Sequence, residues 1–237
     1  LRLNISNRLL EDMHPADLAD IVEELSPEDR EAIFENIDSE VAADALSEVE
    51  PTIQASILES LETETAADII EEMAPDEAAD VLAELEEETS EEILEEMESE
   101  PKHDVEELME FDEDTAGGLM NTEYISLPES ATVADAMAAL KSSEHLVETL
   151  NALFLVDANE HLKGTVPLGR LFLHDGSTSL TELTVETQIE VHVDERQDRV
   201  TELFDKYNLL ALPVVDEEKK LAGVITADDI ISVLRQK

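Results

Sequence analysis

Residues 75–85 read PDEAADVLAEL, and the spacing of their apolar residues decides the fold of the first half of the chain. Val81, Leu82 and Leu85 follow the pattern i, i+1, i+4, which places all three on one side of a helix and does not fit a strand. Pro75 precedes them and suits the first turn of a helix, where its missing N–H costs nothing. The stretch therefore predicts a short amphipathic helix.

The same apolar pattern recurs every twelve residues. The triplets are Leu9-Leu10-Met13, Ile21-Val22-Leu25, Ile33-Phe34-Ile37, Ala45-Leu46-Val49, Ile57-Leu58-Leu61, Ile69-Ile70-Met73, Val81-Leu82-Leu85 and Ile93-Leu94-Met97. Twelve residues allow about two and a half helical turns and a tight corner. Because such short helices are unstable alone, they must bury their apolar stripes against neighbours. We therefore predict a solenoid of stacked repeats, ended by a degraded ninth copy at Val105 and Met109. Ser26, before Pro27, is the expected N-cap of one repeat.

Carboxylates follow the same repeat and line one lane of the predicted solenoid. Five residues before the last residue of a stripe stand Asp20, Asp44, Asp68, Asp80 and Glu92. Asp76 lies four residues before Asp80, so both carboxylates share a helix face and repel each other by a few tenths of a kcal/mol. We interpret most of the acids as a solvated surface. A lane with almost no basic counterpart nevertheless favours a cation, and a divalent ion between two carboxylates reverses the sign of their interaction.

The charge of the chain excludes several partners. The sequence has 62 acidic and 14 basic residues and a net charge of −48, and 41 of the acids lie within the first 115 residues. The first half would therefore repel nucleic acid and anionic lipid, whereas it would attract cations or a basic protein surface. There is no cysteine, which excludes disulfides, thiolate zinc sites and cysteine nucleophiles. No run of 18 apolar residues is present. The chain starts at Leu1 rather than Met, so we expect it to be part of a longer protein.

The second half of the chain contains a different repeat. ALFLVDANEHLKGTVPLGRL (152–171) and ALPVVDEEKKLAGVITADDI (211–230) align without gaps at an offset of 59 residues. Each segment is typical of a strand, an acidic turn, a second strand and a helix. A short strand and a helix precede each of them, in residues 125–140 and 191–204. We therefore predict a duplicated β-α-β-β-α unit of roughly 60 residues.

These segments resemble a tandem pair of CBS domains, most clearly in YNLLALPVVDEEKKLAGVITADDIISVL, residues 207–234. Together with FDEDTAGGLM (111–120) and the acidic repeats, the whole chain resembles the cytosolic region of MgtE-type magnesium transporters. The resemblance implies an all-α right-handed superhelical solenoid of 12-residue repeats, followed by an α/β tandem CBS-domain pair. The implied divisions are an acidic helical domain at 1–110, a linker at 111–121, and CBS domains at 122–180 and 181–237.

The resemblance also implies a function. The chain would be the cytosolic magnesium-sensing module of a channel, in which several Mg²⁺ ions bridge the acidic domain and the CBS domains and favour the closed state. Carboxylate and carbonyl oxygens suit a hard cation, although ligand type alone does not separate Mg²⁺ from Mn²⁺ or Ca²⁺. The implied ligand positions are Asp44, Asp76, Asp80, Gly118 (through its carbonyl), Asp198, Asn208 and Asp229. Asn208 and Ser232 stand where carboxylates are expected in the family.

Partners and a nucleotide are implied in the same way. A homodimer through the CBS domains, a following transmembrane channel domain and a place on the cytoplasmic side of the inner membrane are expected. Thr226 and Asp229 in GVITADD fit the adenosine-binding pattern of CBS domains, which suggests ATP or AMP. The first repeat has Pro167 and Arg170 instead. The alternative is that Thr226 caps the following helix and Asp229 serves the metal or the surface.

Two other interpretations remain open at this point. In the first, the chain is a stand-alone nucleotide-responsive adaptor without a channel. In the second, it is an acidic scaffold that binds a basic protein. The segment DEDTAGGLMNTE (112–123) partly fits a calcium loop, but Ala116 replaces a ligand and YISLP reads as a strand rather than an exit helix. No arrangement for acid–base or nucleophilic catalysis is found, so we do not expect an enzyme.

Overall fold

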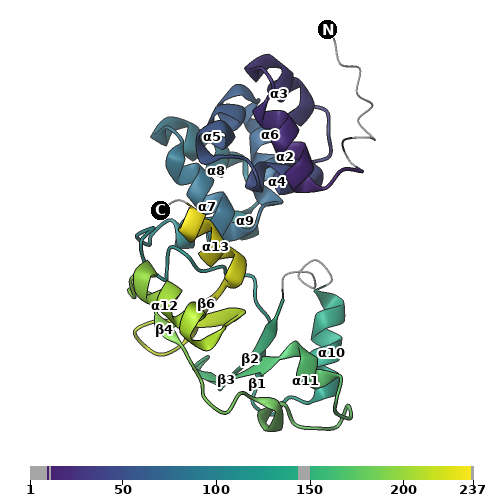
Figure 1. Cartoon of the computed structure of the whole chain (residues 1–237), viewed down its shortest axis with the longest axis vertical. Coiled ribbons are helices and arrows are strands. Elements are labelled where there is room, and N and C mark those ends of the chain that lie inside the picture. The colour runs from purple at the N-terminus through teal and green to yellow at the C-terminus, as the bar shows by residue number, and fades with distance from the viewer. Residues whose placement is uncertain (1–9, 11, 144–149, 236–237) are drawn as a thin grey trace. The chain divides into compact units, whose positions relative to one another are not determined.

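The computed structural model describes residue 10, residues 12–143 and residues 150–235 of the chain (Figure 1). The chain divides into two compact units, Leu1–Glu110 and Phe111–Lys237. The first unit is helical, and the second contains two small sheets with their helices. This order agrees with the fold class predicted from the sequence.

The first unit confirms the twelve-residue repeat. Its helices are α2 (Pro15–Glu23), α3 (Pro27–Phe34), α4 (Ser39–Ser47), α5 (Pro51–Ser60), α6 (Thr63–Glu71), α7 (Pro75–Glu84), α8 (Glu87–Glu96) and α9 (Ser99–Leu108). Each begins twelve residues after the one before it. Proline opens α2, α3, α5 and α7, and the Ser26 hydroxyl caps α3 by accepting the N–H of Asp29 at 3.3 Å. Proline and the capping side chains therefore start these helices where the sequence indicated.

Helices of the first unit pack mainly on their second neighbours along the chain. Contacts join α2 to α4, α4 to α6 and α6 to α8, and likewise α3 to α5, α5 to α7 and α7 to α9. None of the described stripe residues is exposed. Pairs of buried alanines, such as Ala42-Ala43 and Ala66-Ala67, lie just before the stripes. Small side chains there let helices approach closely, a feature that the apolar triplets alone did not indicate.

The end of the solenoid differs from the prediction in one residue. Val105 is buried as expected, but Met109 is 37% exposed, and Leu108 is buried in its place. Helix α9 ends at Leu108, and Met109 is its C-cap. The ninth repeat therefore closes one residue earlier than the spacing of the other stripes predicts.

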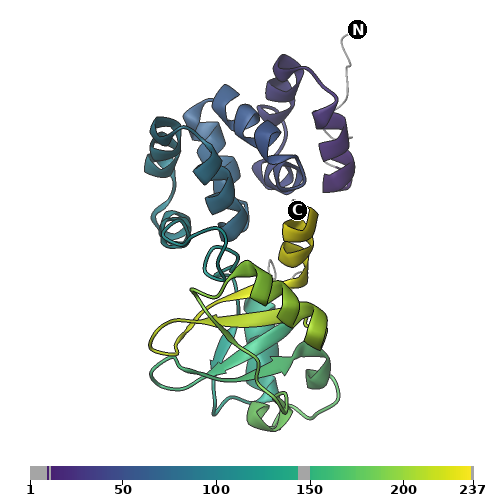
Figure 2. The ribbon, with the colours of Figure 1, turned by 60° about the vertical axis from the view of Figure 1, so that its left-hand side comes forward.

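The second unit contains two three-stranded sheets with the same topology. The first is built from β1 (Ser126–Pro128), β2 (Ala152–Val156) and β3 (Leu162–Pro167), and the second from β4 (Val191–His192), β5 (Ala211–Val215) and β6 (Leu221–Thr226). In each, a parallel pair is followed by an antiparallel hairpin. The accompanying helices are α10 (Val133–Ser142), α11 (Leu168–Leu171), η2 (Leu180–Leu183), α12 (Gln197–Tyr207) and α13 (Ala227–Arg235) (Figure 2). The predicted duplication is confirmed, although α11 is much shorter than α13.

The two hairpin turns match each other and bond to each other. Glu160 and Lys219 are 59 residues apart, and both have a left-handed backbone with φ of 68°. The carbonyl of Glu160 accepts the N–H of Leu221 at 3.1 Å, and the carbonyl of Lys219 accepts the N–H of Leu162 at 3.3 Å. This reciprocal pair of bonds joins the two halves about an approximate twofold relationship.

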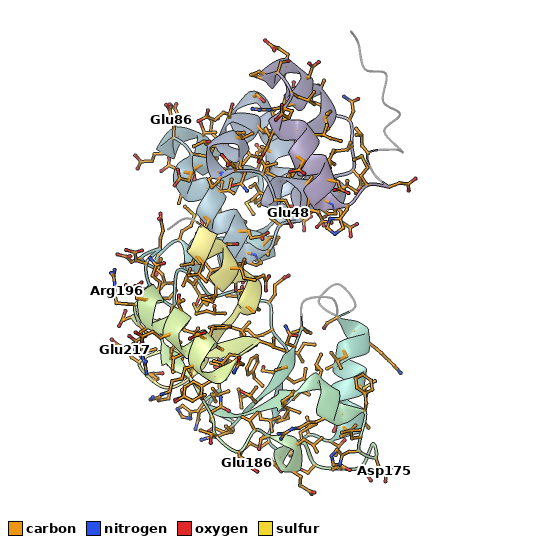
Figure 3. All side chains as sticks on the ribbon, viewed as in Figure 1. Glu48, Glu86, Asp175, Glu186, Arg196 and Glu217 are labelled. Atoms are coloured by element: carbon orange, nitrogen blue, oxygen red, sulfur yellow. The ribbon has the colours of Figure 1, made fainter. Side chains whose placement is uncertain are left out.

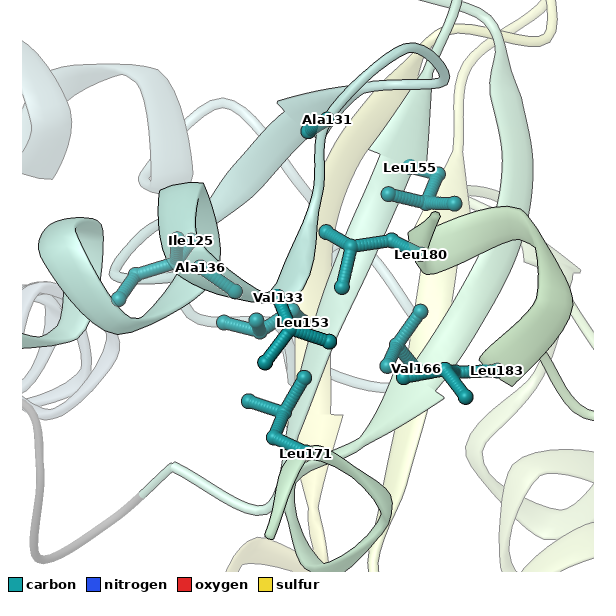
Figure 4. Packing of buried hydrophobic residues seen from close by; sticks show 10 residues of the cluster. All are labelled: Ile125, Ala131, Val133, Ala136, Leu153, Leu155, Val166, Leu171, Leu180 and Leu183. Carbon is teal, nitrogen blue, oxygen red and sulfur yellow. The ribbon is translucent and has the colours of Figure 1, made fainter. Parts of the chain in front are cut away.

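Apolar packing completes the second unit. Residues from α10, β2, β3 and η2 form one buried cluster that includes Val133, Leu153, Val166 and Leu180 (Figure 4). A second cluster brings Phe154 of the first half against Leu221 and Val224 of the second. The two halves therefore share a core as well as a pair of turns.

Candidate functional site

The predicted cation residues fall into two groups, one in each unit. Asp44 lies on α4, and Asp76 and Asp80 lie on α7. Gly118, Asp198, Asn208 and Asp229 belong to the second unit. Among the described residues, no three His, Asp or Glu side chains converge closely enough to hold a metal ion. Each group therefore offers at most a partial set of oxygen ligands for a cation.

In the first unit, one hydrogen bond ties together the two helices that carry the predicted ligands. The Ser47 hydroxyl at the end of α4 donates to the Glu77 carboxylate in the first turn of α7 at 2.5 Å. Asp44 precedes Ser47 by three residues, and Asp80 follows Glu77 by three, so each lies within about one helical turn of this bond. Asp76 is half-buried, and Asp44 and Asp80 are exposed. Glu77 is a neighbour of these acids that the sequence did not single out.

Other acids of the first unit have a structural role. The Glu23 carboxylate, at the end of α2, accepts the backbone N–H of Glu50 at 2.9 Å, and the Glu71 carboxylate accepts the N–H of Glu98. Glu50 and Glu98 are the N-caps of α5 and α9, and neither caps its helix with its own side chain. A carboxylate is favourable there because of the unpaired N–H groups and the helix dipole. The interpretation of most acids as a solvated surface therefore does not extend to these two, which cap helices.

This cross-helix capping recurs at intervals of 24 residues and changes at its middle position. Glu23, Ser47 and Glu71 occupy equivalent places, each at the end of a helix and 24 residues from the next. Glu23 and Glu71 cap the third helix further along the chain, whereas Ser47 binds the Glu77 side chain instead. The first turn of α7, which holds Asp76 and Glu77, is therefore built differently from those of α5 and α9.

In the second unit, Thr226 and Asp229 lie together at the start of α13. The Asp229 carboxylate accepts the Thr226 N–H at 2.6 Å and the Thr226 hydroxyl at 2.9 Å. The same hydroxyl lies 2.7 Å from an Asp228 carboxylate oxygen. Burial raises the pKa of Asp229, the Thr226 hydrogen bonds oppose that rise, and the nearby Asp228 charge adds to it. The structure thus gives Asp229 a helix-capping role.

The equivalent place in the first half is occupied by a structural arginine. The Arg170 guanidinium donates to the carbonyls of Leu183 at 3.0 Å and Thr184 at 2.6 Å. Pro167 ends β3 there. The two halves therefore differ in the way that their sequences indicated.

The remaining predicted ligands lie along the junction and α12. Asp198 is exposed in the first turn of α12, and Asn208 ends that helix with a left-handed backbone (φ 48°, ψ 51°). Asparagine tolerates this conformation better than most residues, which gives Asn208 a backbone role. Gly118 lies in a tight turn, where an added Cβ would be 2.5 Å from the carbonyl of Asp112.

The calcium-loop interpretation of residues 112–123 is wrong. No exit helix follows, because Asn121 pairs with Val224 in a β-bridge and strand β1 begins at Ser126. Asp114, a would-be ligand, instead contacts Arg196 and Gln197. The segment is part of the second unit.

No helix among the described residues is both long and apolar enough to cross a membrane. Residues 13–114 match the MgtE intracellular N domain, and residues 116–174 and 186–236 match the CBS domain. The class of protein is therefore an acidic helical domain joined to a CBS pair.

Part of the chain is also similar in sequence to known magnesium transporters. The chain is 36% identical over 131 residues to a magnesium transporter MgtE of Enterococcus faecalis and 37% identical over 131 residues to one of Thermus thermophilus. Each match covers 55% of this chain and 29% of the relative.

Solved structures agree over nearly the whole chain. The soluble part of a magnesium transporter superposes with a TM-score of 0.90 and 30% identity, covering 97% of this chain and 91% of the other. The cytosolic domain of the Mg²⁺ channel MgtE in complex with ATP gives 0.90 and 32%, covering 96% and 93%. The chain belongs to the MgtE family and has the fold of its cytosolic region.

Proposed function

We propose that this chain is the magnesium-sensing regulatory module of a magnesium channel or transporter. Mg²⁺ bridges the acidic helical domain and the CBS domains and favours the closed state of the channel. When Mg²⁺ is scarce, the acidic surfaces repel each other and the two domains separate. The observation that carries this proposal is a chain with net charge −48 whose fold matches the cytosolic domain of a Mg²⁺ channel.

The chemistry of the predicted ligands supports Mg²⁺. All are oxygen donors, and Mg²⁺ prefers one or two carboxylates with retained waters rather than a complete protein cage. That preference is compatible with two partial sets: Asp44, Asp76 and Asp80 in the acidic domain, and Gly118, Asp198, Asn208 and Asp229 in the second unit. We propose that several ions are held in this way.

The proposed module works within a larger assembly. We propose a homodimer through the CBS domains, followed by a transmembrane channel domain, on the cytoplasmic side of the membrane. Phe172 and Leu173 after α11 are 77% and 80% exposed, and Ile231 and Leu234 on α13 are 51% and 55% exposed. Phe172 and Ile231 are equivalent residues of the two halves, so apolar surface recurs at related positions. Such surface supports association between copies. We propose no catalytic activity.

Binding of an adenine nucleotide is a second candidate function. If it were the main function, the chain would act as a stand-alone nucleotide-responsive adaptor without a channel. Thr226 and Asp229 have the spacing and proximity that would hold a ribose, and one structurally similar MgtE domain is a complex with ATP. Calorimetric titration with ATP tests this site. Heat that disappears in Thr226→Ala supports it, and no heat with the unaltered chain excludes it.

Small-angle scattering with and without millimolar Mg²⁺ tests the proposed sensing function. Mg²⁺ is expected to reduce the radius of gyration, and Asp76→Ala combined with Asp80→Ala is expected to abolish the reduction. Glu87→Ala with Glu91→Ala is the matched control, because it also removes two carboxylates four residues apart on one helix. An equal reduction by monovalent salt at matched ionic strength would show simple charge screening and reject the proposal.

A further inference from the structure

The junction between the two units is bonded into the second CBS domain. Helix α12 begins at Gln197, and its N-cap residue Arg196 makes no side-chain cap of its own. Asp114, which lies 82 residues before Arg196 in the chain, supplies the missing hydrogen-bond acceptors. Its carbonyl accepts the Gln197 N–H at 2.9 Å, and its carboxylate accepts from the Arg196 guanidinium at 3.3 Å and from the Gln197 side-chain amide. Figure 3 shows Arg196 at this end of α12.

Two further attachments hold the same segment. The N–H groups of Ala116 and Gly117 donate to the carbonyls of Glu195 at 2.7 Å and Val193 at 2.8 Å. Asn121 exchanges two hydrogen bonds with Val224 of β6, at 2.7 and 2.9 Å. Residues 114–121 are therefore bonded to the second CBS domain, although most of them belong to the segment 116–174 that matches the first one.

The start of the junction is itself a tight turn. The Asp112 carbonyl accepts from the Thr115 N–H at 2.9 Å and from its hydroxyl at 2.6 Å, and the Asp112 carboxylate accepts the Asp114 N–H at 3.0 Å. A Cβ added at Gly117 would overlap the Phe111 ring. The second unit begins at Phe111, so this turn directly follows the last residue of the acidic domain. Asp114 is therefore only four residues from the end of the first unit along the chain.

We propose that Asp114 is a positioning residue that couples the acidic domain to α12. Ordering of the acidic domain by a divalent cation is passed through the Asp112–Thr115 turn to the first turn of α12, which carries Asp198. The far end of the same helix is Asn208, so α12 joins two of the proposed cation residues. This inference rests on the proposed sensing function and identifies the segment that transmits the signal.

Hydrogen–deuterium exchange on the full 237-residue chain, with and without Mg²⁺, tests this coupling. In the unaltered chain, Mg²⁺ is expected to slow exchange in the first turn of α12 by about fivefold, the effect of one hydrogen bond. Asp114→Ala is expected to remove that Mg²⁺-dependent slowing while the Mg²⁺-induced compaction seen by scattering persists. Asp114→Asn, which keeps the size and one acceptor oxygen, is expected to give an intermediate effect and guards against a folding defect.

Glu113→Ala is the matched control, because Glu113 is an exposed neighbouring acid of the same charge. It should behave as the unaltered chain does. Slowing that survives in Asp114→Ala would overturn the coupling, and so would compaction without any slowing in the unaltered chain. Absence of both compaction and slowing would overturn the proposed sensing function together with this inference.

Discussion

Ser47 donates a 2.5 Å hydrogen bond to Glu77, thirty residues further along the chain, and this bond joins α4 to α7. Ser47 occupies the position in the repeat where Glu23 and Glu71 cap other helices. At this position Ser47 instead donates to a side chain. Asp44 and Asp80 flank it within about a turn on either helix. Some acids of this domain, such as Glu23 and Glu71, therefore cap helices. Others, such as Asp44 and Asp80, lie near the Ser47–Glu77 bond.

Ser47→Ala tests the structural value of this bond. The free energy of unfolding of the acidic domain should fall by about 1 kcal/mol, the usual net contribution of one hydrogen bond. Urea denaturation followed by circular dichroism measures it. Ser56→Ala on α5 is the control, since Ser56 is exposed, and should leave stability unchanged or slightly higher. Equal effects of the two variants would count against a specific role for Ser47.

Glu71→Ala tests the cross-helix caps. Removal of this carboxylate leaves the N-terminus of α9 without its acceptor and should cost about 1 kcal/mol. Glu72→Ala removes the same charge from the next residue and should cost less or even stabilise, because it relieves repulsion in a strongly acidic domain. Thermal melts of both variants in low salt provide the comparison. A larger loss in Glu72→Ala would refute the assignment.

Asp229→Asn should change how stability depends on pH. Burial raises the pKa of Asp229 above its ordinary value of 3.8, so the folded state binds this proton more tightly than the unfolded state does. The contribution of the protonated carboxyl is therefore present below about pH 4 and is lost as pH rises through the raised pKa. Asparagine does not titrate, so the variant should gain stability relative to the unaltered chain over that rise. Denaturation at several pH values without divalent cations measures the difference, and a flat difference would contradict it.

Gly223→Ala tests the attachment of the junction to β6. A Cβ there would lie 2.7 Å from the Met120 side chain and 2.9 Å from the carbonyl of Asn121, which itself bonds Val224. Overpacking of this kind costs about 1–3 kcal/mol. Gly169→Ala is the control, because nothing lies within 4 Å of its added Cβ. Equal stability of the two variants would show that the junction is not held here.

The sequence predicted the parts of the fold that depend on local periodicity. Twelve-residue spacing placed the helices, and the 59-residue offset placed both hairpins, because each pattern reflects burial within one repeat. The caps from Glu23 and Glu71 could not be predicted, since they depend on which helix ends meet in space. The attachment of Asp114 to Arg196 and Gln197 crosses 82 residues and was missed for the same reason.

For the candidate site, the sequence indicated which residues to consider but not the distances between them. Thr226 and Asp229 form hydrogen bonds with each other at the start of α13, but their role in nucleotide binding remains a prediction. The roles of Asp44, Asp76, Asp80 and the other proposed ligands remain predictions, because the family resemblance that suggested them carries no distances. Domain boundaries at 110/111, 121/122 and 180/181 likewise remain predictions.

The most direct measurement is a crystal structure of the chain grown with Mn²⁺ in place of Mg²⁺, with the ions located by anomalous scattering. The account predicts peaks about 2 Å from the carboxylate oxygens of Asp76 or Asp80, with ligands from the second unit completing the shell. Closed domains with no peak at these carboxylates would contradict it.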